Sequence, residues 1–312
     1  MLRMAAAGAI ALAFSPAFTS CSQNVKITAP HYALVYGIAA YQYKPLTYTV
    51  DDALGMVTAL TGGGWDPANI REKADAAVTK AQIKSDILSL ANVSSDSTVL
   101  IYYSGHGSYA DATWVTLYPT YSGPYIVPYD AVGIYGLDST TAPNLVSPAE
   151  LESWLAQLGT KNIILILDSC FSGGFADPGS AIDSSPPDYS AMPSYSAFAA
   201  AMANFGGLLA ANASASGGKT PIVLSAAGSK ESSYDGTSAM AHGVFTYYLL
   251  QAATSGDADG DGFVTITEAY DYTAKWVKTW DQTLTTQDNL SEVWPFLPHL
   301  SGGVGDLVLF TK

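Results

Sequence analysis

The sequence predicts an α/β protein with a mostly parallel sheet that is covered by helices on both faces. Continuous apolar runs, which are typical of buried parallel strands, alternate along the chain with segments of helical periodicity. The 312 residues are 48% apolar, which is enough for one large α/β core and excludes disorder for most of the chain. The formal net charge of −14 disfavours nucleic acid as a partner and favours cationic substrates.

Apolar runs and helix start signals define the elements in chain order. The predicted strands are residues 31–39, 98–104, 162–167, 221–226 and 306–310. The predicted helices are residues 51–60, 79–91, 147–158, 243–253 and 266–278. The acidic pair Asp51-Asp52 opens the first helix, and capping boxes at Thr79 and Ser147 open the next two. Residues 176–219 are rich in Ala, Ser, Gly and Pro and are predicted to be a flexible insertion.

The first 21 residues are predicted to be an export signal. Arg3 provides a positive start, and residues 4–14 form an apolar stretch that is too short to span a bilayer. Small residues before Cys21 resemble a bacterial lipoprotein cleavage site, at which the thiol receives lipid; ordinary signal cleavage nearby is the alternative. We therefore expect an exported protein, secreted or anchored as a lipoprotein at the bacterial cell envelope, that contacts the membrane only through this lipid.

Two predicted strands end next to residues with nucleophilic chemistry. The strand at 98–104 is followed by His106 between two glycines, and the strand at 162–167 is followed by Cys170. Both residues then lie at the carboxyl-terminal edge of the sheet, where a thiol and an imidazole can meet for nucleophilic catalysis. With Cys21 lipidated or removed, Cys170 has no disulfide partner, and burial as a small apolar residue is the structural alternative. A zinc site is disfavoured, because no further ligands cluster near the pair.

The segments around these two residues read Tyr-Ser-Gly-His-Gly at 103–107 and Asp-Ser-Cys-Phe-Ser-Gly at 168–173. They resemble the signature of the caspase-like cysteine peptidases, and most closely that of the metacaspases and their bacterial relatives. The resemblance covers nearly all of the mature chain, because further family segments follow in the same order at residues 32–38, 51–53, 127–131, 224–227 and 242–247. It implies one caspase-like peptidase domain at residues 26–312, folded as a three-layer α-β-α sandwich around a mostly parallel sheet of roughly six strands.

The resemblance implies a cysteine endopeptidase. The Cys170 thiolate is then the nucleophile, and His106 is the acid/base that passes a proton to the leaving amine. The backbone N–H groups of Gly107 and Cys170 are expected to bind the oxyanion of the tetrahedral intermediate. The other histidines, which are His31, His242 and His299, are interpreted as structural.

The resemblance to metacaspases further implies cleavage after Arg or Lys, since carboxylates pair with a buried basic side chain. Asp168 matches a family pocket position and Asp52 matches another. The structural alternatives are helix capping by Asp51 or Asp52 and a turn role for Asp168. A sister family that cleaves after Asn shares the His-Gly and strand-Cys plan, but Asp168-Ser169-Cys170 fits the basic-specific branch better. The insertion contains no Lys or Arg before Lys219, so self-cleavage within residues 176–218 is not expected.

Residues 257–268 fit the twelve-residue calcium loop of an EF hand, with helical segments on either side. The predicted ligands are Asp257, Asp259, Asp261, Phe263 through its carbonyl, Thr265 and Glu268. A solvated Asp-Gly loop is the alternative. Because extracellular calcium is abundant enough to fill weak sites, we expect a structural Ca²⁺ and no organic cofactor.

Three functions are compatible with these patterns. The first is an active cysteine endopeptidase, the second a catalytically silent caspase-like binding protein, and the third a calcium-dependent surface lipoprotein. The presence of both His106 and Cys170 favours the first, because the other two leave this pair unexplained. We expect a monomer that acts on proteins or peptides with a basic residue at the cleaved position and that binds no nucleic acid.

Overall fold

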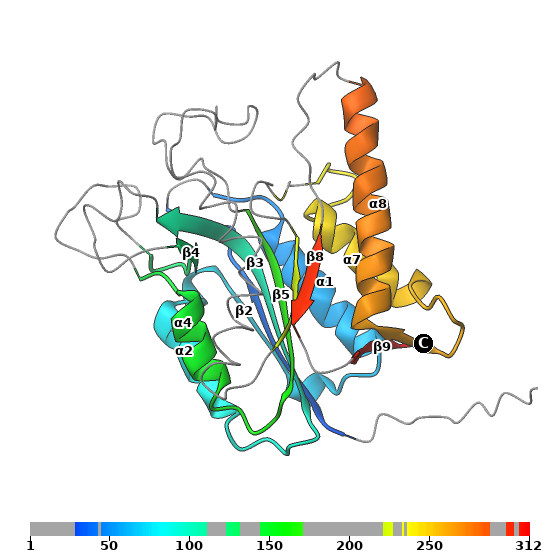
Figure 1. Cartoon of the computed structure of the whole chain (residues 1–312). Helices are drawn as coiled ribbons and strands as arrows, with labels where there is room; N and C mark the ends of the chain where they lie inside the picture. The colour runs from blue at the N-terminus through cyan, green and yellow to red at the C-terminus, as the bar shows by residue number, and fades with distance from the viewer. Residues whose placement is uncertain are drawn as a thin grey trace, which may run out of the picture.

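In the computed structural model, seven strands form one sheet with helices on both faces (Figure 1). The structure describes residues 29–42, 45–110, 123–131, 144–170, 221–226, 233, 236–287, 298–302 and 306–312. The predicted signal segment with Cys21 and the insertion at 176–219 lie outside the described residues. Among the helices that are described, none is long and apolar enough to cross a bilayer.

The sheet has the strand order β2-β1-β3-β5-β6-β8, and β4 pairs with the far end of β3. Neighbouring strands run parallel from β2 to β6, whereas β4 and β8 pair antiparallel. The strands are β1 (His31–Gly37), β2 (Ile70–Ala74), β3 (Thr98–Ala110), β4 (Gly123–Ile126), β5 (Asn162–Cys170), β6 (Ile222–Ser225) and β8 (His299–Gly302). The mostly parallel sheet and its helical layers agree with the predicted fold class.

The helices begin close to the predicted signals. Thr79 caps the second helix, where its hydroxyl accepts the Gln82 N–H at 3.1 Å. Ser147 and Glu150 form a complete capping box at the start of the third. The first helix begins at Thr49, two residues before the acidic pair that was expected to open it. The helices are α1 (Thr49–Gly62), α2 (Lys80–Ser89), α4 (Pro148–Leu155), α7 (Val244–Ser255) and α8 (Ile266–Gln287), with 3-10 turns at Pro67–Asn69 and Asp75–Ala77.

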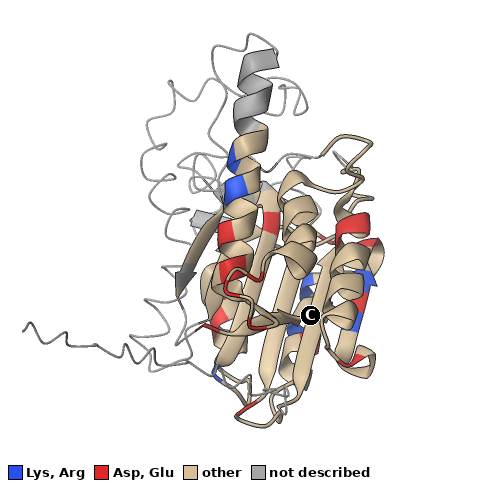
Figure 2. Cartoon of the chain, turned by 90° about the vertical axis from the view of Figure 1, so that its right-hand side faces the viewer, with Lys and Arg blue, Asp and Glu red and all other residues tan. Residues whose placement is uncertain are grey.

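The predicted final strand forms outside the main sheet. Strand β9 (Val308–Thr311) pairs antiparallel with β7 (Phe263–Thr265) in a separate two-stranded sheet. The edge strand beside β6 in the main sheet is β8, which was not predicted from the sequence. The segment between α7 and β7 brings acidic residues to the base of α8, where they are drawn in red in Figure 2.

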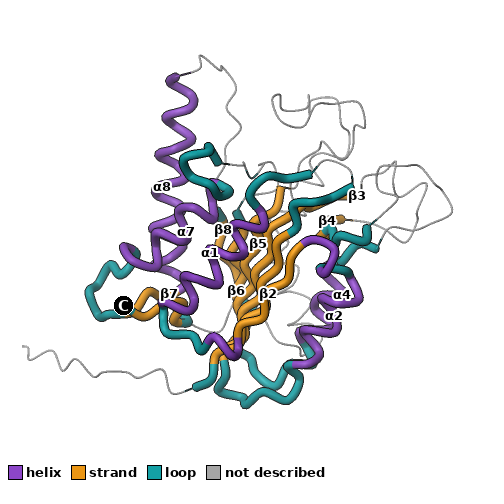
Figure 3. Tube along the Cα trace, turned by 180° about the vertical axis from the view of Figure 1, so that it is seen from behind, coloured by secondary structure: helices purple, strands orange, loops and turns teal. Residues whose placement is uncertain are grey.

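Side chains alternate between the two faces of the sheet, so each face has its own apolar core. Helices α2 and α4 cover one face, over a core that includes Ile101 and Leu165. Helices α1, α7 and α8 cover the other face, over a core that includes Tyr102, Ile166 and Phe245 (Figure 3). Helices α1 and α7 therefore lie side by side on one face of the sheet, and the start of each lies near the carboxyl-terminal ends of β3 and β5.

Strand β2 and the ends of β3 and β5 depart from the sequence prediction. Strand β2 reads Ile-Arg-Glu-Lys-Ala, which is a charged composition typical of an edge strand rather than an apolar run. Strand β3 continues to Ala110 and β5 to Cys170, beyond their predicted ends at residues 104 and 167. As a result, His106 and Cys170 lie within paired strands and not in the loops that follow them.

Candidate active site

The register between β3 and β5 sets His106 directly opposite Cys170. The two strands are parallel, and their last paired residues are Ser104 with Asp168, Gly105 with Ser169, and His106 with Cys170. Neighbouring strands lie about 4.8 Å apart, so the two backbones are adjacent at this point. The structure thus brings together the two residues that the sequence analysis singled out.

The backbone of His106 is held by two tyrosines at a place where the sheet loses a strand. Strand β1 pairs with β3 only as far as Ser104. Beyond that point, the Tyr41 hydroxyl accepts the His106 N–H at 3.0 Å, and the Tyr103 hydroxyl donates to the His106 carbonyl at 2.8 Å. The Val127 N–H donates to the same carbonyl at 3.1 Å. Two phenol groups and the backbone of Val127, which follows β4, therefore bind the backbone of His106 where β1 no longer pairs with β3.

The Tyr41 ring also packs against the imidazole of His106. Their ring centroids are 4.5 Å apart, and only 2% of His106 is exposed. The two phenol oxygens of Tyr41 and Tyr103 lie 3.0 Å apart, and Tyr41 also donates to the Val127 carbonyl at 2.8 Å. Burial raises the pKa of Tyr41 well above its usual value, so this phenol stays neutral and can donate.

Tyr41 was not predicted from the sequence, although Gly105 is a signal of close packing at this point. A Cβ at Gly105 would lie 2.7 Å from the phenol oxygens of both Tyr41 and Tyr103. Only glycine allows the strand to pass so close to these hydroxyls. The Gly-His-Gly pattern therefore marks tight packing beneath His106.

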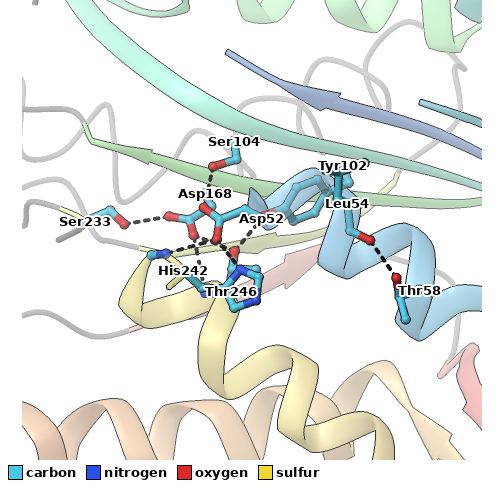
Figure 4. A network of polar contacts seen from close by, with 10 residues as sticks. Asp52, Leu54, Thr58, Tyr102, Ser104, Asp168, Ser233, His242 and Thr246 are labelled. Atoms are coloured by element: carbon cyan, nitrogen blue, oxygen red, sulfur yellow. Dashed lines mark hydrogen bonds and ion pairs between the residues drawn. The ribbon is translucent and has the colours of Figure 1, made fainter. Parts of the chain in front are cut away.

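Asp52 and Asp168 meet at the same end of the sheet and are both buried (Figure 4). Asp52 comes from the first turn of α1 and Asp168 from β5, two residues before Cys170. Asp52 makes no capping hydrogen bond within α1, so the helix-cap alternative is wrong for this residue. Both carboxylates instead accept hydrogen bonds from the start of α7, which is distant from them in the sequence.

Asp52 accepts hydrogen bonds from two other elements. The Ser104 hydroxyl donates at 2.9 Å from β3, and the Gly243 N–H donates at 2.9 Å from the N-terminus of α7. The His242 imidazole lies 3.1 Å from the same carboxylate oxygen as Gly243. Burial raises the pKa of Asp52, and the donors His242, Ser104 and Gly243 oppose that rise.

Asp168 is held in a similar way by hydroxyl groups. Thr246 donates to it from its hydroxyl at 2.6 Å and from its N–H at 3.3 Å, and the Ser233 hydroxyl donates at 2.6 Å. Burial, together with the nearby charge of Asp52, raises the pKa of Asp168 to about 7. The two carboxyl groups therefore titrate as a coupled pair.

Three of the groups that contact the carboxylates were not predicted from the sequence, namely Ser104, Ser233 and Thr246, and His242 was predicted to be structural. A signal exists for Ser104, since it precedes His106 by two residues just as Asp168 precedes Cys170. Side chains two residues apart share a face of a strand, which predicts that Ser104 and Asp168 lie together. His242 gives no comparable signal, because 190 residues separate it from Asp52.

The calcium-type loop connects α7 to β7 and α8. One oxygen atom from each of Asp257, Asp259 and Asp261 lies within 4.8 Å of the others. Glu268 accepts hydrogen bonds from the N–H groups of Ala258 at 3.0 Å and Thr265 at 2.9 Å, which ties the end of the loop to its start.

The loop also contains a glycine with a positive φ and an ion pair to the C-terminal residue. Gly262 has a φ of +90°, as the sharp turn at this position requires. The ammonium group of Lys312 lies 3.6 Å from a carboxylate oxygen of Asp257. Oxygen donors on both sides of a tight turn fit a hard cation such as Ca²⁺.

The sequence matches the caspase domain of peptidase family C14 over residues 30–289. Among solved structures, the fold is similar to protein GSU0716 from Geobacter sulfurreducens, with 17% identity, a TM-score of 0.53, and coverage of 88% of this chain and 94% of that one. It is also similar to caspase-1 from Spodoptera frugiperda, with 11% identity, a TM-score of 0.54, and coverage of 91% and 93%. No curated protein matches the sequence.

Proposed function

The chain belongs to the caspase domain family of peptidases, and on this premise we propose that it is a cysteine endopeptidase that cleaves after Arg or Lys. The observation that carries the proposal is the pairing of His106 with Cys170 at the carboxyl end of two parallel strands. In the proposed reaction, the Cys170 thiolate attacks the peptide carbonyl carbon and forms a thioester. His106 gives its proton to the leaving amine, and water then hydrolyses the thioester.

The backbone would supply the electrophilic part of the site. We propose that the N–H groups of Gly107 and Cys170 bind the oxyanion that forms when the thiolate attacks. Loss of one such donor typically lowers the rate by about a hundredfold or more. The two tyrosines that hold the backbone of His106 support this proposal, because they fix the residue next to Gly107.

The preference for a basic residue rests on Asp52 and Asp168. Both are buried, and among the described residues neither forms an ion pair with a Lys or Arg side chain. Buried carboxylates without a cation raise the free energy of the folded protein, and a guanidinium or ammonium group of the substrate would relieve that cost. The N-terminus of α7, which donates to both carboxylates, offers the competing structural explanation.

Fluorogenic peptides that differ only in the residue before the scissile bond test this function. We expect wild-type protein under reducing conditions to hydrolyse the Arg and Lys peptides and to leave the Asn and Asp peptides intact. The Cys170→Ala variant should be inactive, while Ser169→Ala, which changes the neighbouring residue on the opposite face of β5, should remain active. Hydrolysis of no peptide would favour the catalytically silent binding protein, and cleavage after Asn would favour the sister family.

We further propose that residues 257–268 bind a structural Ca²⁺. The gathering of three carboxylate oxygens, the positive φ of Gly262 and the contacts of Glu268 support this assignment. When bound, the ion would connect the end of α7 to the start of α8. The ligands would be Asp257, Asp259, Asp261, the Phe263 carbonyl, Thr265 and Glu268.

Export with a lipid on Cys21 is proposed from the sequence alone. Residues 1–21 have the charge and apolar pattern of a signal, and Cys21 follows small residues. In a bacterial host, the protein is expected in the membrane fraction, and Cys21→Ala is expected in the soluble exported fraction. Equal distribution of the two proteins would contradict lipidation.

A further inference from the structure

His242 reaches the carboxylate pair from the surface of the protein. It precedes Gly243, the N-cap residue of α7, and 22% of its side chain is exposed, compared with 2% of the Asp52 side chain. Its Nδ1 lies 3.1 Å from an oxygen of Asp52. Of the basic side chains that the structure describes, it alone lies within ion-pair distance of either carboxylate.

We propose that His242 is a positioning residue for substrate specificity, which holds Asp52 as the fixed anion of the pair so that the pair can receive a basic side chain of the substrate. This inference rests on the proposed function, because it takes Asp52 and Asp168 as the groups that bind the basic residue. His242 itself acts through Asp52 and need not touch the substrate.

The hydrogen bonds around Asp52 explain why one donor matters. The Ser104 hydroxyl holds one oxygen, while the Gly243 N–H and the imidazole share the other. Burial favours the neutral form of the carboxyl group, and each donor favours the anion. Without the imidazole, one of the hydrogen bonds that favour the anionic form of Asp52 is lost, while burial, which favours the neutral form, stays the same.

The surroundings of Gly243 make the imidazole difficult to replace. A Cβ on Gly243 would lie 2.9 Å from Asp168 and 3.2 Å from Asp52, so the start of α7 already touches both carboxylates. No side chain at residue 243 could take over as a donor in this space. The side-chain donor at this end of α7 is therefore that of His242, which precedes the N-cap residue Gly243.

Few other groups near Asp52 can change charge close to neutral pH. Asp168 faces it from β5, and burial together with the Asp52 charge raises the pKa of Asp168 to about 7. The Tyr102 phenol faces it from β3, and burial raises the pKa of Tyr102 well above its usual value. Asp51, next to it in α1, is exposed, and Ser104, Ser233 and Thr246 do not titrate. Among the described groups that face Asp52, Asp168 is therefore the one whose ionisation most directly changes the charge of the pair.

Peptide binding to a catalytically inactive variant tests the inference, because the peptide is not consumed during the measurement. The Cys170→Ala protein is titrated calorimetrically with an acetylated peptide amide that ends in Arg, and with the same peptide ending in citrulline, its uncharged counterpart. His242→Phe removes the donor, His242→Asn keeps a donor of similar reach, and His299→Asn in β8 is the matched control. Melting curves confirm that each variant is folded, and His242→Ala replaces the Phe variant if the latter does not fold.

At pH 6.5 we expect His242→Phe to bind the Arg peptide about tenfold more weakly than its parent, because a hydrogen bond to an anion is lost. The deficit in affinity should narrow to less than about threefold at pH 8.5, because a higher pH favours the anionic form of the carboxyl groups in the variant and the parent alike. His242→Asn should lie between the Phe variant and the parent, and His299→Asn should match the parent. The citrulline peptide should bind equally to all proteins.

Three results would overturn the inference or its premise. If His242→Phe binds the Arg peptide as its parent does at pH 6.5, His242 has no part in specificity. If the loss is the same at both pH values and extends to citrulline, the role of His242 is structural only. If the parent itself does not distinguish Arg from citrulline, the basic-residue assignment in the proposed function is wrong, and the inference falls with it.

Discussion

The Tyr41 hydroxyl is one of the groups that hold the backbone of the proposed acid/base residue. Tyr41→Phe keeps the ring that packs on His106 but removes the acceptor for the His106 N–H and the donor to Val127. We expect kcat to fall about tenfold with little change in KM, and the free energy of unfolding to fall by about 1–3 kcal/mol, because the buried His106 N–H loses this acceptor, whereas the Val127 carbonyl still accepts from the Tyr103 hydroxyl at 2.8 Å. Steady-state kinetics and thermal melts measure the two effects.

The same substitution elsewhere provides the comparison for Tyr41. Tyr272→Phe removes a hydroxyl between α7 and α8 that makes only a long contact of 3.4 Å with Gln251. It should leave kcat unchanged. A Tyr41→Phe protein that loses stability but keeps its kcat would show that the hydroxyl serves folding and not the positioning of His106.

The carboxyl group of Asp168 is expected to lower stability as it ionises. Burial and the charge of Asp52 raise its pKa to about 7, whereas an unfolded Asp has a pKa of about 4. The folded protein therefore keeps a proton that the unfolded chain loses, and stability declines from about pH 4 until the folded group ionises near pH 7. Asp168→Asn cannot ionise, so its melting temperature should exceed that of wild type at pH 8 and approach it at pH 5.

Activity should move in the opposite direction for this variant. If Asp168 binds the basic residue, Asp168→Asn is more stable at pH 8 but hydrolyses Arg peptides poorly, which is a common compromise at functional sites. Asp96→Asn changes an exposed carboxylate and should alter neither property. A melting difference that does not depend on pH would contradict the raised pKa.

At the scale of elements, the sequence predicted best where local patterns suffice. Capping boxes placed α2 and α4, and apolar runs placed β1, β3, β5 and β6. The edge strands β2 and β8 were missed because neither is a continuous apolar run, and a strand at the edge of a sheet tolerates polar side chains. The predicted strands ended at residues 104 and 167, but the pairing between β3 and β5 continues as far as His106 and Cys170.

The parts of the site that were not predicted depend on contacts between distant segments. Asp52 meets His242 across 190 residues, and Tyr41 meets His106 across 65. No periodicity or spacing in one segment encodes such contacts. The first arises only after α1 and α7 pack on one face of the sheet, and the second only after Tyr41 packs with Tyr103 in the core of the other face. The candidate pair His106 and Cys170 could be predicted from the sequence, because each residue comes shortly after its own apolar run.

The calcium loop is a unit that can be tested by its effect on stability. An ion that binds only the folded protein raises its melting temperature, so EDTA should lower the melting temperature of wild type and added Ca²⁺ should restore it. Glu268→Gln should melt lower than wild type in Ca²⁺ and respond little to EDTA. Asp271→Asn changes an exposed carboxylate three residues further along α8 and should behave as wild type. Unchanged melting with EDTA, and no metal by elemental analysis, would remove the proposed ion.

At the scale of the whole molecule, the distribution of basic residues determines where the protein could cleave itself. The chain has 13 Lys and Arg residues against 27 Asp and Glu. None of the basic residues lies between positions 176 and 218, in the stretch that follows Cys170. An enzyme that cleaves only after Arg or Lys has no target there, so its activation cannot require a cut in this stretch.

Prolonged incubation of the purified protein therefore tests specificity without a synthetic substrate. We expect wild type to remain uncut within residues 176–218, or to be cut only after basic residues such as Lys219, as read by sequencing the termini of any fragments. The Cys170→Ala protein, incubated alone, should give no fragments, and mixed with active wild type it reveals cleavage between molecules. A fragment that begins inside residues 177–218 and depends on Cys170 would mean that the buried carboxylates serve the start of α7 and not a basic side chain.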